Sequence, residues 1–334
     1  MLKEWDIRPE KAAQLLNRLR LQDIKSHFLD DKGNIINSYF LEVKCPACGK
    51  RRNSQKFKKE SFSFKCCSNC GTLYVSPRPK PPKLHEYYRD SGSIAFFIKE
   101  ILEKTAKARK EKILLPKAKK AIFYLKKFRV SRKLLVEIGG GNGLFLETMK
   151  EIRSGFKRYL NIEPSKEGAR LTQNRGFDVI EDIIENVKDL HADCICAFEL
   201  IEHLFDPLSF CIKIKRLLNK NGIFILTTPS TEGLDLMLLG RDSDNISAPN
   251  HLNYFNIHSI EILLKRAGLK TVAIETPGVL DIDILKNKVV NGYKLEDRYI
   301  SFLLKQPNEV LEKFQLFLQQ NKLSSHMFVV NKKI

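Results

Sequence analysis

Long apolar runs are missing from this sequence, and their absence excludes one class of protein. No stretch is apolar over the roughly eighteen residues that a membrane-spanning helix needs. The residues after Met1 contain no apolar segment behind a basic start, so we expect no secretory signal. These two absences predict a cytoplasmic protein.

Glycine and proline are scarce, at 17 and 13 of 334 residues, which excludes collagen-like and low-complexity chains. Hydrophobic residues make up 43% of the chain and charged residues 29%, a composition that can fill a core. We therefore expect a globular protein with two domains, or with one large domain and attachments.

Acidic residues are also in short supply. The chain has 39 Asp and Glu against 58 Lys and Arg, a formal net charge of +19. The excess lies in the first 133 residues, and residues 99–133 alone carry 14 basic and 3 acidic side chains. A basic front half favours an acidic partner: a nucleotide-linked substrate, an anionic glycan or lipid surface, or RNA. Solvated lysines on helix surfaces would give the same composition, so charge alone does not choose.

Five of the eight cysteines crowd into residues 45–70. They include two CxxCG knuckles separated by eighteen residues, Cys45–Cys48 and Cys67–Cys70. Two such knuckles complete a tetrahedron of thiolates, so we predict a closed, structural zinc site. Cys66 is surplus, because pairing it with Cys70 would give CxxxC. Reduced core thiols or redox chemistry are the alternative.

The spacing of apolar residues predicts how the chain is organised. We expect an N-terminal helical extension over 1–42, a zinc-ribbon module over 43–79, a basic helical linker over 80–133 and a larger domain over 134–334. The proline-rich segment 76–82 is predicted to be an extended linker and a domain boundary. After residue 133, apolar strands alternate with helices, which is typical of a parallel sheet covered on both faces.

One segment of this domain carries the strongest chemical signal. A buried strand, 134–138, runs into the glycine-rich turn 139–143 and then into a helix. Glycines there let the backbone approach a ligand closely, and the helix start offers free N–H groups. The dinucleotide pattern GxGxxG would need glycine at Leu144 or Leu146, so NAD is disfavoured.

This segment resembles the E/D-x-G-x-G-x-G motif of class I S-adenosylmethionine-dependent methyltransferases, through Glu137, Gly139, Gly141 and Gly143. The resemblance extends over about 134–275. It implies an α/β, Rossmann-like fold with a seven-stranded sheet and helices on both faces, preceded here by the zinc ribbon and the helical linker. It also implies S-adenosylmethionine as the cofactor.

The resemblance assigns further cofactor contacts residue by residue. Glu163 matches the carboxylate that takes the two ribose hydroxyls, and Asp182 matches the acidic contact to the adenine edge. Residues 197–207 resemble the segment after the fourth strand in the small-molecule branch, which places Phe198 and Glu199 at the cofactor. The Asn/Asp-Pro-Pro-Tyr/Phe motif of base and glutamine amine methyltransferases is missing there.

Methyl transfer from a sulfonium needs alignment, and it needs a base when the acceptor is a hydroxyl. His203 follows the fourth strand, at the edge where such sheets bind ligands. His251 lies in a stretch, 249–255, that resembles the acceptor-pocket border of the same branch. Both are candidate catalytic residues, and a structural role is the alternative for each. Residues 276–323 are predicted to be an inserted helical cap on the acceptor side, or else a dimer interface.

These observations predict a methyltransferase that acts on a sugar or another hydroxylated glycan or lipid precursor, including nucleotide- or lipid-linked compounds, with transfer to oxygen favoured over carbon. A zinc-ribbon methyltransferase acting on ribosomal or transfer RNA is the alternative, although the basic helices lack interleaved aromatic residues that would stack on bases. A catalytically silent binding or scaffold protein is a third reading, and failure to bind S-adenosylmethionine would favour it.

Overall fold

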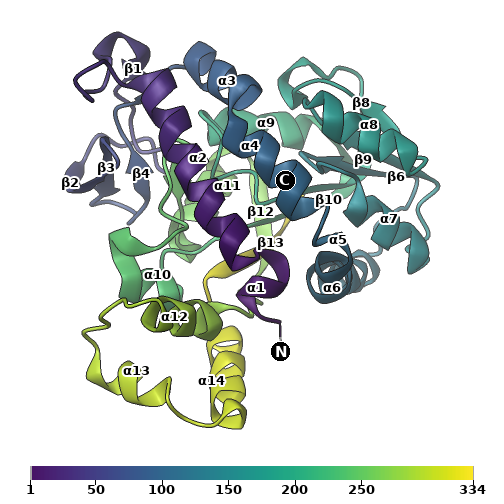
Figure 1. Ribbon diagram of the computed structural model, residues 1–334. Coiled ribbons are helices and arrows are strands. Elements are labelled where there is room, and N and C mark those ends of the chain that lie inside the picture. Colours follow the sequence, from purple (N-terminus) through teal and green to yellow (C-terminus); the bar gives the residue numbers. More distant parts are fainter. Residues whose placement is uncertain (1, 334) are drawn as a thin grey trace. The chain divides into compact units, whose positions relative to one another are not determined.

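The computed structural model describes residues 2–333, and the chain forms two compact units, each assembled from separate segments (Figure 1). The first, called the ribbon unit below, contains residues 1–105, 229–259 and 275–327. The second, called the sheet unit, contains residues 106–228, 260–274 and 328–334. No helix among the described residues is long and apolar enough to cross a membrane.

A seven-stranded sheet forms the core of the sheet unit, in the order β12-β13-β10-β9-β6-β7-β8. Its strands are β6 (Leu134–Ile138), β7 (Arg158–Ile162), β8 (Asp178–Ile180), β9 (Ala192–Phe198), β10 (Leu218–Pro229), β12 (Leu269–Glu275) and β13 (His326–Lys333). The pairs β10–β9, β9–β6, β6–β7 and β7–β8 are parallel. The chain adds β7 and β8 on one side of β6 and then β9 on the other side. The order of the strands therefore reverses between β6 and β9, which is the topological switch point of the sheet.

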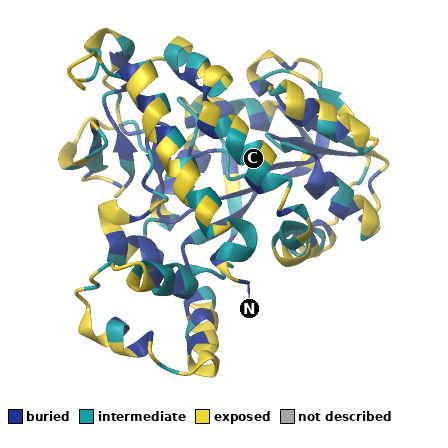
Figure 2. Ribbon diagram, in the orientation of Figure 1, coloured by how far each residue is buried: buried dark blue, intermediate teal, exposed yellow. Residues whose placement is uncertain are grey.

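Both faces of this sheet are covered. Successive side chains of a strand point to opposite faces, and all five residues of β6 are buried (Figure 2). The helices of this part are α5 (Ala106–Arg109), α6 (Leu115–Lys127), α7 (Leu144–Glu151), α8 (Lys166–Asn174), α9 (Pro207–Leu217) and α11 (Ile257–Arg266), with a π-helical turn at Lys110–Leu114 and a 3₁₀ turn at Ile184–Asn186. The prediction of a Rossmann-like, seven-stranded α/β fold is confirmed.

The ribbon unit holds the cysteine knuckles on a second sheet, of order β11-β4-β3-β2. Its strands are β2 (Asn53–Lys59), β3 (Phe62–Cys67), β4 (Leu73–Val75) and β11 (Asn253–Tyr254), and a separate pair joins β1 (Phe40–Leu41) to β5 (Arg78–Pro79). The helices before residue 105 are α1 (Glu4–Ile7), α2 (Glu10–Phe28), α3 (Pro81–Asp90) and α4 (Gly92–Phe96), with a 3₁₀ turn at Asn37–Tyr39 and a π-helical turn at Phe97–Leu102.

The predicted cap region, 276–323, forms helices α12 (Asp281–Val290), α13 (Arg298–Leu303) and α14 (Asn308–Gln320). They share an apolar cluster with α10 (Leu234–Leu239), which is followed by the 3₁₀ turn Gly240–Asp242. Asp281 connects two of these segments because its carboxylate accepts hydrogen bonds from Gln315 Nε2, at 2.7 Å, and from the backbone N–H of Ser325, at 2.8 Å.

The structure does not divide the chain at the proline-rich segment, where a boundary was expected. Arg78 is fully buried, and its guanidinium donates to the carbonyl oxygens of Val75, at 3.0 Å, and Leu252, at 3.3 Å. Residues 78–79 also pair with β1. An extended, proline-rich stretch is here an edge strand that is held by a buried arginine, so residues 1–105 form one continuous part of the ribbon unit.

The predicted basic linker, 80–133, also divides differently, between Thr105 and Ala106. Ala118, Ala121 and Leu125 of α6 are buried in the same cluster as Leu135 and Met149. These α6 residues recur at three- and four-residue spacing, so the helix has an apolar face for the sheet unit and a basic face for solvent. Because α6 is rich in lysine, its composition alone does not reveal the apolar face.

We predict that Arg78→Leu lowers the free energy of unfolding by about 2–4 kcal/mol, because two buried carbonyl oxygens lose their charged donor. Urea denaturation of the zinc-saturated protein measures the change. Arg89→Leu is the matched control: Arg89 is exposed and pairs with its neighbour Asp90, so we expect a change within about 0.5 kcal/mol. Equal effects of the two substitutions would contradict this account of Arg78.

Candidate active site and metal centre

The glycine-rich turn lies between β6 and α7, at the point where the order of the strands reverses. Gly139, Gly141 and Gly143 have φ values of 67°, 55° and 73°, in the left-handed region that side chains with a Cβ disfavour. A Cβ at Gly143 would lie 2.9 Å from Thr172 of α8. The three predicted glycines are therefore required by the backbone itself, whatever ligand the turn holds.

Glu137 lies directly beneath this turn. A Cβ added at Gly140 would come within 2.6 Å of the Glu137 carboxyl group, so only glycine fits above it. Burial raises the pKa of Glu137 to about 8, and Oε2 has no hydrogen-bond partner among the described residues. At neutral pH this carboxyl group is protonated and holds an unused hydrogen-bonding atom under the turn.

Glu163 follows β7 and is joined to the same turn. Its Oε2 accepts a hydrogen bond from the N–H of Gly141, and its Oε1 accepts one from the N–H of Ser165, each at 2.9 Å. Each carboxylate oxygen has a second lone pair, so the group retains the capacity to accept two hydroxyls. The residue predicted to bind ribose thus also holds the glycine turn in place.

These features fit an adenosyl cofactor. The turn brings backbone close to a ligand, a buried carboxyl group has an unused polar atom beneath it, and a carboxylate stands at the end of the next strand. Gly139, Gly141, Gly143 and Glu137 would hold the amino-acid and sulfonium part, and Glu163 the ribose. These assignments remain predictions about binding.

Asp182 follows β8 and precedes the 3₁₀ turn at Ile184–Asn186, to which its side chain is hydrogen-bonded. Its Oδ1 accepts hydrogen bonds from the N–H of Ile183, at 2.7 Å, and from Asn186 Nδ2, at 2.8 Å. This local role is sufficient to explain an aspartate at that position. Its predicted contact with the adenine edge stays a prediction.

Phe198 is the last residue of β9, and Glu199 follows it directly. Both residues contact Lys117, which the sequence analysis did not identify. The Lys117 ammonium lies 4.7 Å from the centre of the Phe198 ring, 3.8 Å from Glu199 Oε1 and 3.2 Å from Thr227 Oγ1. Glu199 has a φ of 47° and accepts a hydrogen bond from Thr227 Oγ1 at 2.6 Å. Burial lowers the pKa of Lys117, and the Glu199 carboxylate opposes that shift.

A signal for Lys117 was present in the sequence. Lys117, Ala121 and Tyr124 recur at four- and three-residue spacing, so a lysine occupies the apolar stripe of α6. A lysine on a buried stripe needs an acidic partner, and Glu199 supplies it. This places a cation beneath the predicted cofactor contacts Phe198 and Glu199.

The two candidate histidines belong to different units. His203 is in the turn after β9, where its backbone N–H donates to the carbonyl of Leu200 at 3.0 Å. Its side chain is half-buried. Its role as a base or substrate contact stays a prediction.

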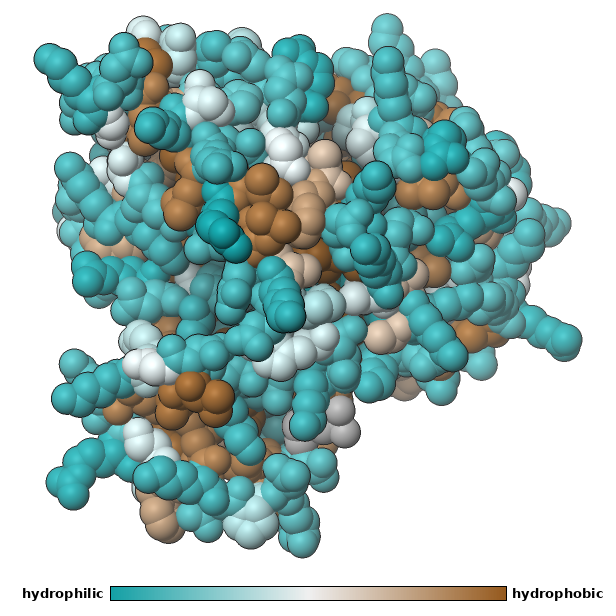
Figure 3. Space-filling view, in the orientation of Figure 1, coloured by the Kyte–Doolittle hydropathy of each residue, from teal (hydrophilic) through white to brown (hydrophobic). Residues whose placement is uncertain are grey.

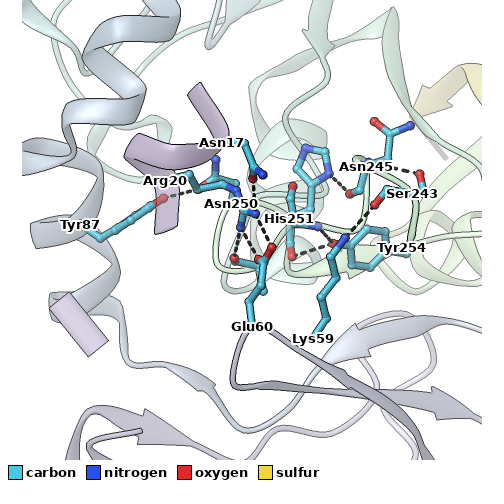
Figure 4. A network of polar contacts seen from close by, with 12 residues as sticks. Asn17, Arg20, Lys59, Glu60, Tyr87, Ser243, Asn245, Asn250, His251 and Tyr254 are labelled. Atoms are coloured by element: carbon cyan, nitrogen blue, oxygen red, sulfur yellow. Dashed lines mark hydrogen bonds and ion pairs between the residues drawn. The ribbon is translucent and has the colours of Figure 1, made fainter. Parts of the chain in front are cut away.

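The loop that carries His251 is held by side chains from three earlier segments of the ribbon unit (Figure 4). Arg20 of α2 donates to the carbonyl of Ala248 at 3.2 Å and pairs with Glu60 of the β2–β3 turn. Lys59 Nζ donates to the Ser243 carbonyl at 2.9 Å. Tyr87 of α3 donates to Asn250 Oδ1 at 2.6 Å. The loop is therefore fixed by residues that precede it by more than 150 positions.

Hydrogen bonds within the loop determine the tautomer of His251. Its Nδ1 lies 2.8 Å from the carbonyl oxygen of Asn245, so this nitrogen carries the proton and donates. In the neutral ring Nε2 then holds the lone pair. The loop is closed by Tyr254, whose hydroxyl donates to the His251 carbonyl and accepts from the N–H of Ser247. The Tyr254 side chain is buried.

The four predicted cysteines come together. Cys45 and Cys70 have sulfurs 3.5 Å apart, as do Cys48 and Cys67, and all four sulfurs lie within 4.8 Å of one another. In each knuckle the glycine has a left-handed φ, 75° at Gly49 and 72° at Gly71, and its N–H donates to the first cysteine's carbonyl. Cys66 lies outside the cluster.

The donor set fits a zinc ion. The hydrogen bond from Cys45 lowers the pKa of Cys70 to about 4, while the Cys45 thiol is held protonated with a raised pKa. A divalent cation would replace that shared proton, and four thiolates complete its tetrahedron without an open position for water. The site suits structural zinc, which stays a proposal.

The segment 252–256 is part of this cysteine sheet, which sequence reasoning missed. Strand β11 pairs with β4, the N–H of Val75 donates to the Leu252 carbonyl, and Asn256 Nδ2 donates to the Cys70 carbonyl at 3.2 Å. A Cβ at Gly71 would lie 2.6 Å from the Asn256 amide. The second knuckle and the loop after β10 are therefore one structure.

We predict that Cys48→Ser lowers the bound zinc from about one ion per chain to nearly none, because three thiolates do not complete the site. Backbone amides of 62–75 and of 252–256 should then exchange hydrogen faster together. Metal analysis and hydrogen-exchange mass spectrometry measure both effects.

Cys66→Ser is the matched control for Cys48→Ser, and it should retain zinc and normal exchange. Loss of zinc from that control, or unchanged exchange at 252–256 in Cys48→Ser, would contradict the assignment.

Comparison with known proteins places the chain in a family. Residues 105–274, about half of the chain, match the model of the methyltransferase domain family. A ubiquinone biosynthesis O-methyltransferase from Actinobacillus pleuropneumoniae is 27% identical over 106 residues, 29% of this chain and 45% of that protein. The chain thus spans less than half the length of the curated relatives it matches.

Two solved structures are among those to which this chain is similar. An S-adenosylmethionine-dependent methyltransferase from Clostridium acetobutylicum has a TM-score of 0.43 and 12% identity, covering 65% of this chain and 90% of that one. A possible histamine N-methyltransferase from Thermotoga maritima has a TM-score of 0.43 and 18% identity, covering 71% and 100%. With the glycine turn and the seven-stranded sheet, the family match leads to one conclusion: the chain belongs to the methyltransferase domain family.

Proposed function

We propose that the protein transfers the methyl group of S-adenosylmethionine to a hydroxyl oxygen of a small molecule, a sugar or another hydroxylated glycan or lipid precursor. The observation that carries the proposal is the glycine turn with Glu137 beneath it and Glu163 beside it. The bound cofactor supplies an electrophilic methyl group on a positively charged sulfur, a good leaving group.

The residues of the chain have three tasks in this reaction. The glycine turn and Glu163 bind the adenosyl group and align it for in-line attack. Glu137, protonated under the turn, donates a hydrogen bond without adding a negative charge. The Lys117 ammonium lies beside Glu199 and offsets the charge of this half-exposed carboxylate, which directly follows β9.

A hydroxyl acceptor needs to lose a proton, and we assign the base to His251. Its Nδ1–H is committed to Asn245, so Nε2 is the acceptor in the neutral ring. The similarity to ubiquinone biosynthesis O-methyltransferases supports oxygen as the acceptor. Carbon methylation of a sugar is the alternative, and it would use the same base on an acidic C–H.

One observation supports RNA as a second candidate acceptor. An open hollow of about 530 Å³ in the sheet unit is lined by Lys150, Arg153, Lys157 and Arg158, with Asp178 paired to Arg158. It lies where β7 and β8 begin, at the opposite edge of the sheet from the glycine turn. Such a surface would bind backbone phosphates and make affinity fall steeply with salt.

We predict that Glu163→Ala weakens S-adenosylmethionine binding by at least about 1.5 kcal/mol, roughly tenfold in Kd, because ribose hydroxyls lose a charged acceptor and the turn loses its anchor. Isothermal titration with S-adenosylmethionine, S-adenosylhomocysteine and NAD measures this.

Glu167→Ala, a change at an exposed carboxylate paired with Arg170 on α8, is the matched control for Glu163→Ala and should leave Kd unchanged. Unchanged affinity in Glu163→Ala would refute the site. No binding of either adenosyl ligand by the unaltered protein would favour a silent scaffold, and salt-sensitive binding of bulk RNA would favour the RNA alternative.

We predict that His251→Ala lowers kcat by about 10²–10⁴-fold while leaving the Kd of the cofactor unchanged, because it removes a proton acceptor and not a cofactor contact. Transfer of labelled methyl to a panel of sugars and phenols identifies an acceptor on which kcat is then measured. His258→Ala, an exposed histidine nearby in sequence, should retain full activity. Full activity of His251→Ala would eliminate it as the base.

A further inference from the structure

Exposed apolar side chains are concentrated on one part of the ribbon unit. Among the described residues, seven large apolar side chains are at least half exposed, and six of them lie on α10 or α12–α14. They are Met237 (67%), Val290 (82%), Tyr299 (69%), Phe302 (62%), Leu316 (52%) and Phe317 (50%). We call these six residues the cap surface. Figure 3 shows apolar side chains gathered over this region, at the lower left. The seventh is Phe123, on α6.

The six side chains of the cap surface lie outside the buried apolar cluster of the same helices. In α13, Ile300 and Leu303 are buried in the cluster shared by α10 and α12–α14, while Tyr299 and Phe302, three residues apart, lie together on the outer face. In α14, Leu311 and Leu318 are buried and Phe317 is exposed. The inner apolar faces of these helices pack against one another in the shared cluster. The outer apolar faces are exposed, which is typical of a surface that binds another molecule or a membrane.

Charge helps to decide whether a second copy of the chain or a lipid surface covers the cap surface. Residues 281–323, which span α12–α14, carry seven Lys and Arg against six Asp and Glu, and the whole chain carries a net +19. Lys294, Arg298 and Lys305 are exposed and lie close in sequence to the aromatic residues of α13, as do the exposed Glu296 and Asp297. A second copy of the chain would bring the same positive excess against itself. An anionic lipid surface complements both the basic and the apolar side chains.

The chemistry of the side chains matches such a surface. Tyrosine and phenylalanine on short amphipathic helices, flanked by lysine and arginine, are typical of segments that lie in the interface of a bilayer. Tyrosine places an apolar ring among acyl chains and its hydroxyl among headgroups.

We propose that the cap surface binds anionic lipid bilayers, with Tyr299, Phe302 and Phe317 entering the headgroup region and Lys294, Arg298 and Lys305 contacting lipid phosphates. The protein would lie on the membrane without crossing it. This inference does not depend on the acceptor of the methyl group, and it would bring a lipid-linked acceptor to the enzyme.

Cosedimentation of the full-length, zinc-loaded protein with vesicles tests the proposal. We expect binding to phosphatidylcholine mixed with phosphatidylglycerol, much weaker binding to phosphatidylcholine alone, and a decrease at high salt. F302S combined with F317S should weaken binding at least about tenfold. F123S changes an aromatic side chain that is equally exposed, at 57%, but lies outside the cap surface, and it should bind as the unaltered protein does.

A charge variant keeps the test decisive if the double serine variant is unstable. K294E combined with K305E alters only exposed side chains and should abolish the preference for phosphatidylglycerol. Absence of vesicle binding, or equal loss in F123S, would overturn the proposal. Analytical ultracentrifugation that finds a dimer dissociated by F302S/F317S, with no vesicle binding, would instead identify the cap surface as a contact between two copies.

Discussion

The backbone pairing of β4 with β11 is the contact on which most of the ribbon unit depends. Through it, a short segment from the second half of the sequence completes the sheet that carries the cysteines. Asn256 then supports the second knuckle, and Arg78 donates to Leu252 from within the same region. The metal centre and the His251 loop therefore share their supports, and neither is an independent module. An ion held by the four cysteines would therefore also stabilise the loop that carries His251.

In the sheet unit, the groups predicted to bind the cofactor also build the turn. Glu163 accepts from the N–H of Gly141, and Glu137 fills the space under Gly140. The arrangement is preorganised, because the carboxyl groups are already oriented by the backbone before any ligand arrives. Glu199 is held in a similar way: its backbone is left-handed, and its carboxylate contacts Lys117 and Thr227. Binding a ligand there requires little rearrangement of the chain.

Sequence reasoning succeeded where the pattern is local. The strand 134–138 with its glycines, and the spacing of Cys45, Cys48, Cys67 and Cys70, each specify their structure within a few residues. It failed for β5 and β11, because strands of two residues have no periodicity to detect. Arg78 was assigned to a linker since nothing near it in sequence indicates the distant carbonyl that it reaches. The unit boundaries were missed for the same reason: they depend on pairings between remote segments.

The long reach of these pairings has a consequence for biosynthesis. Arg78 and Leu252 are 174 residues apart. At translation rates of about 5–20 residues per second, β4 emerges from the ribosome roughly ten to thirty seconds before its partner strand exists. During that interval the nascent cysteine sheet has an unprotected edge, and early capture of a metal ion by the two knuckles would keep it folded until the chain returns. A metal ion bound by the knuckles would then assist folding before the rest of the sheet is complete.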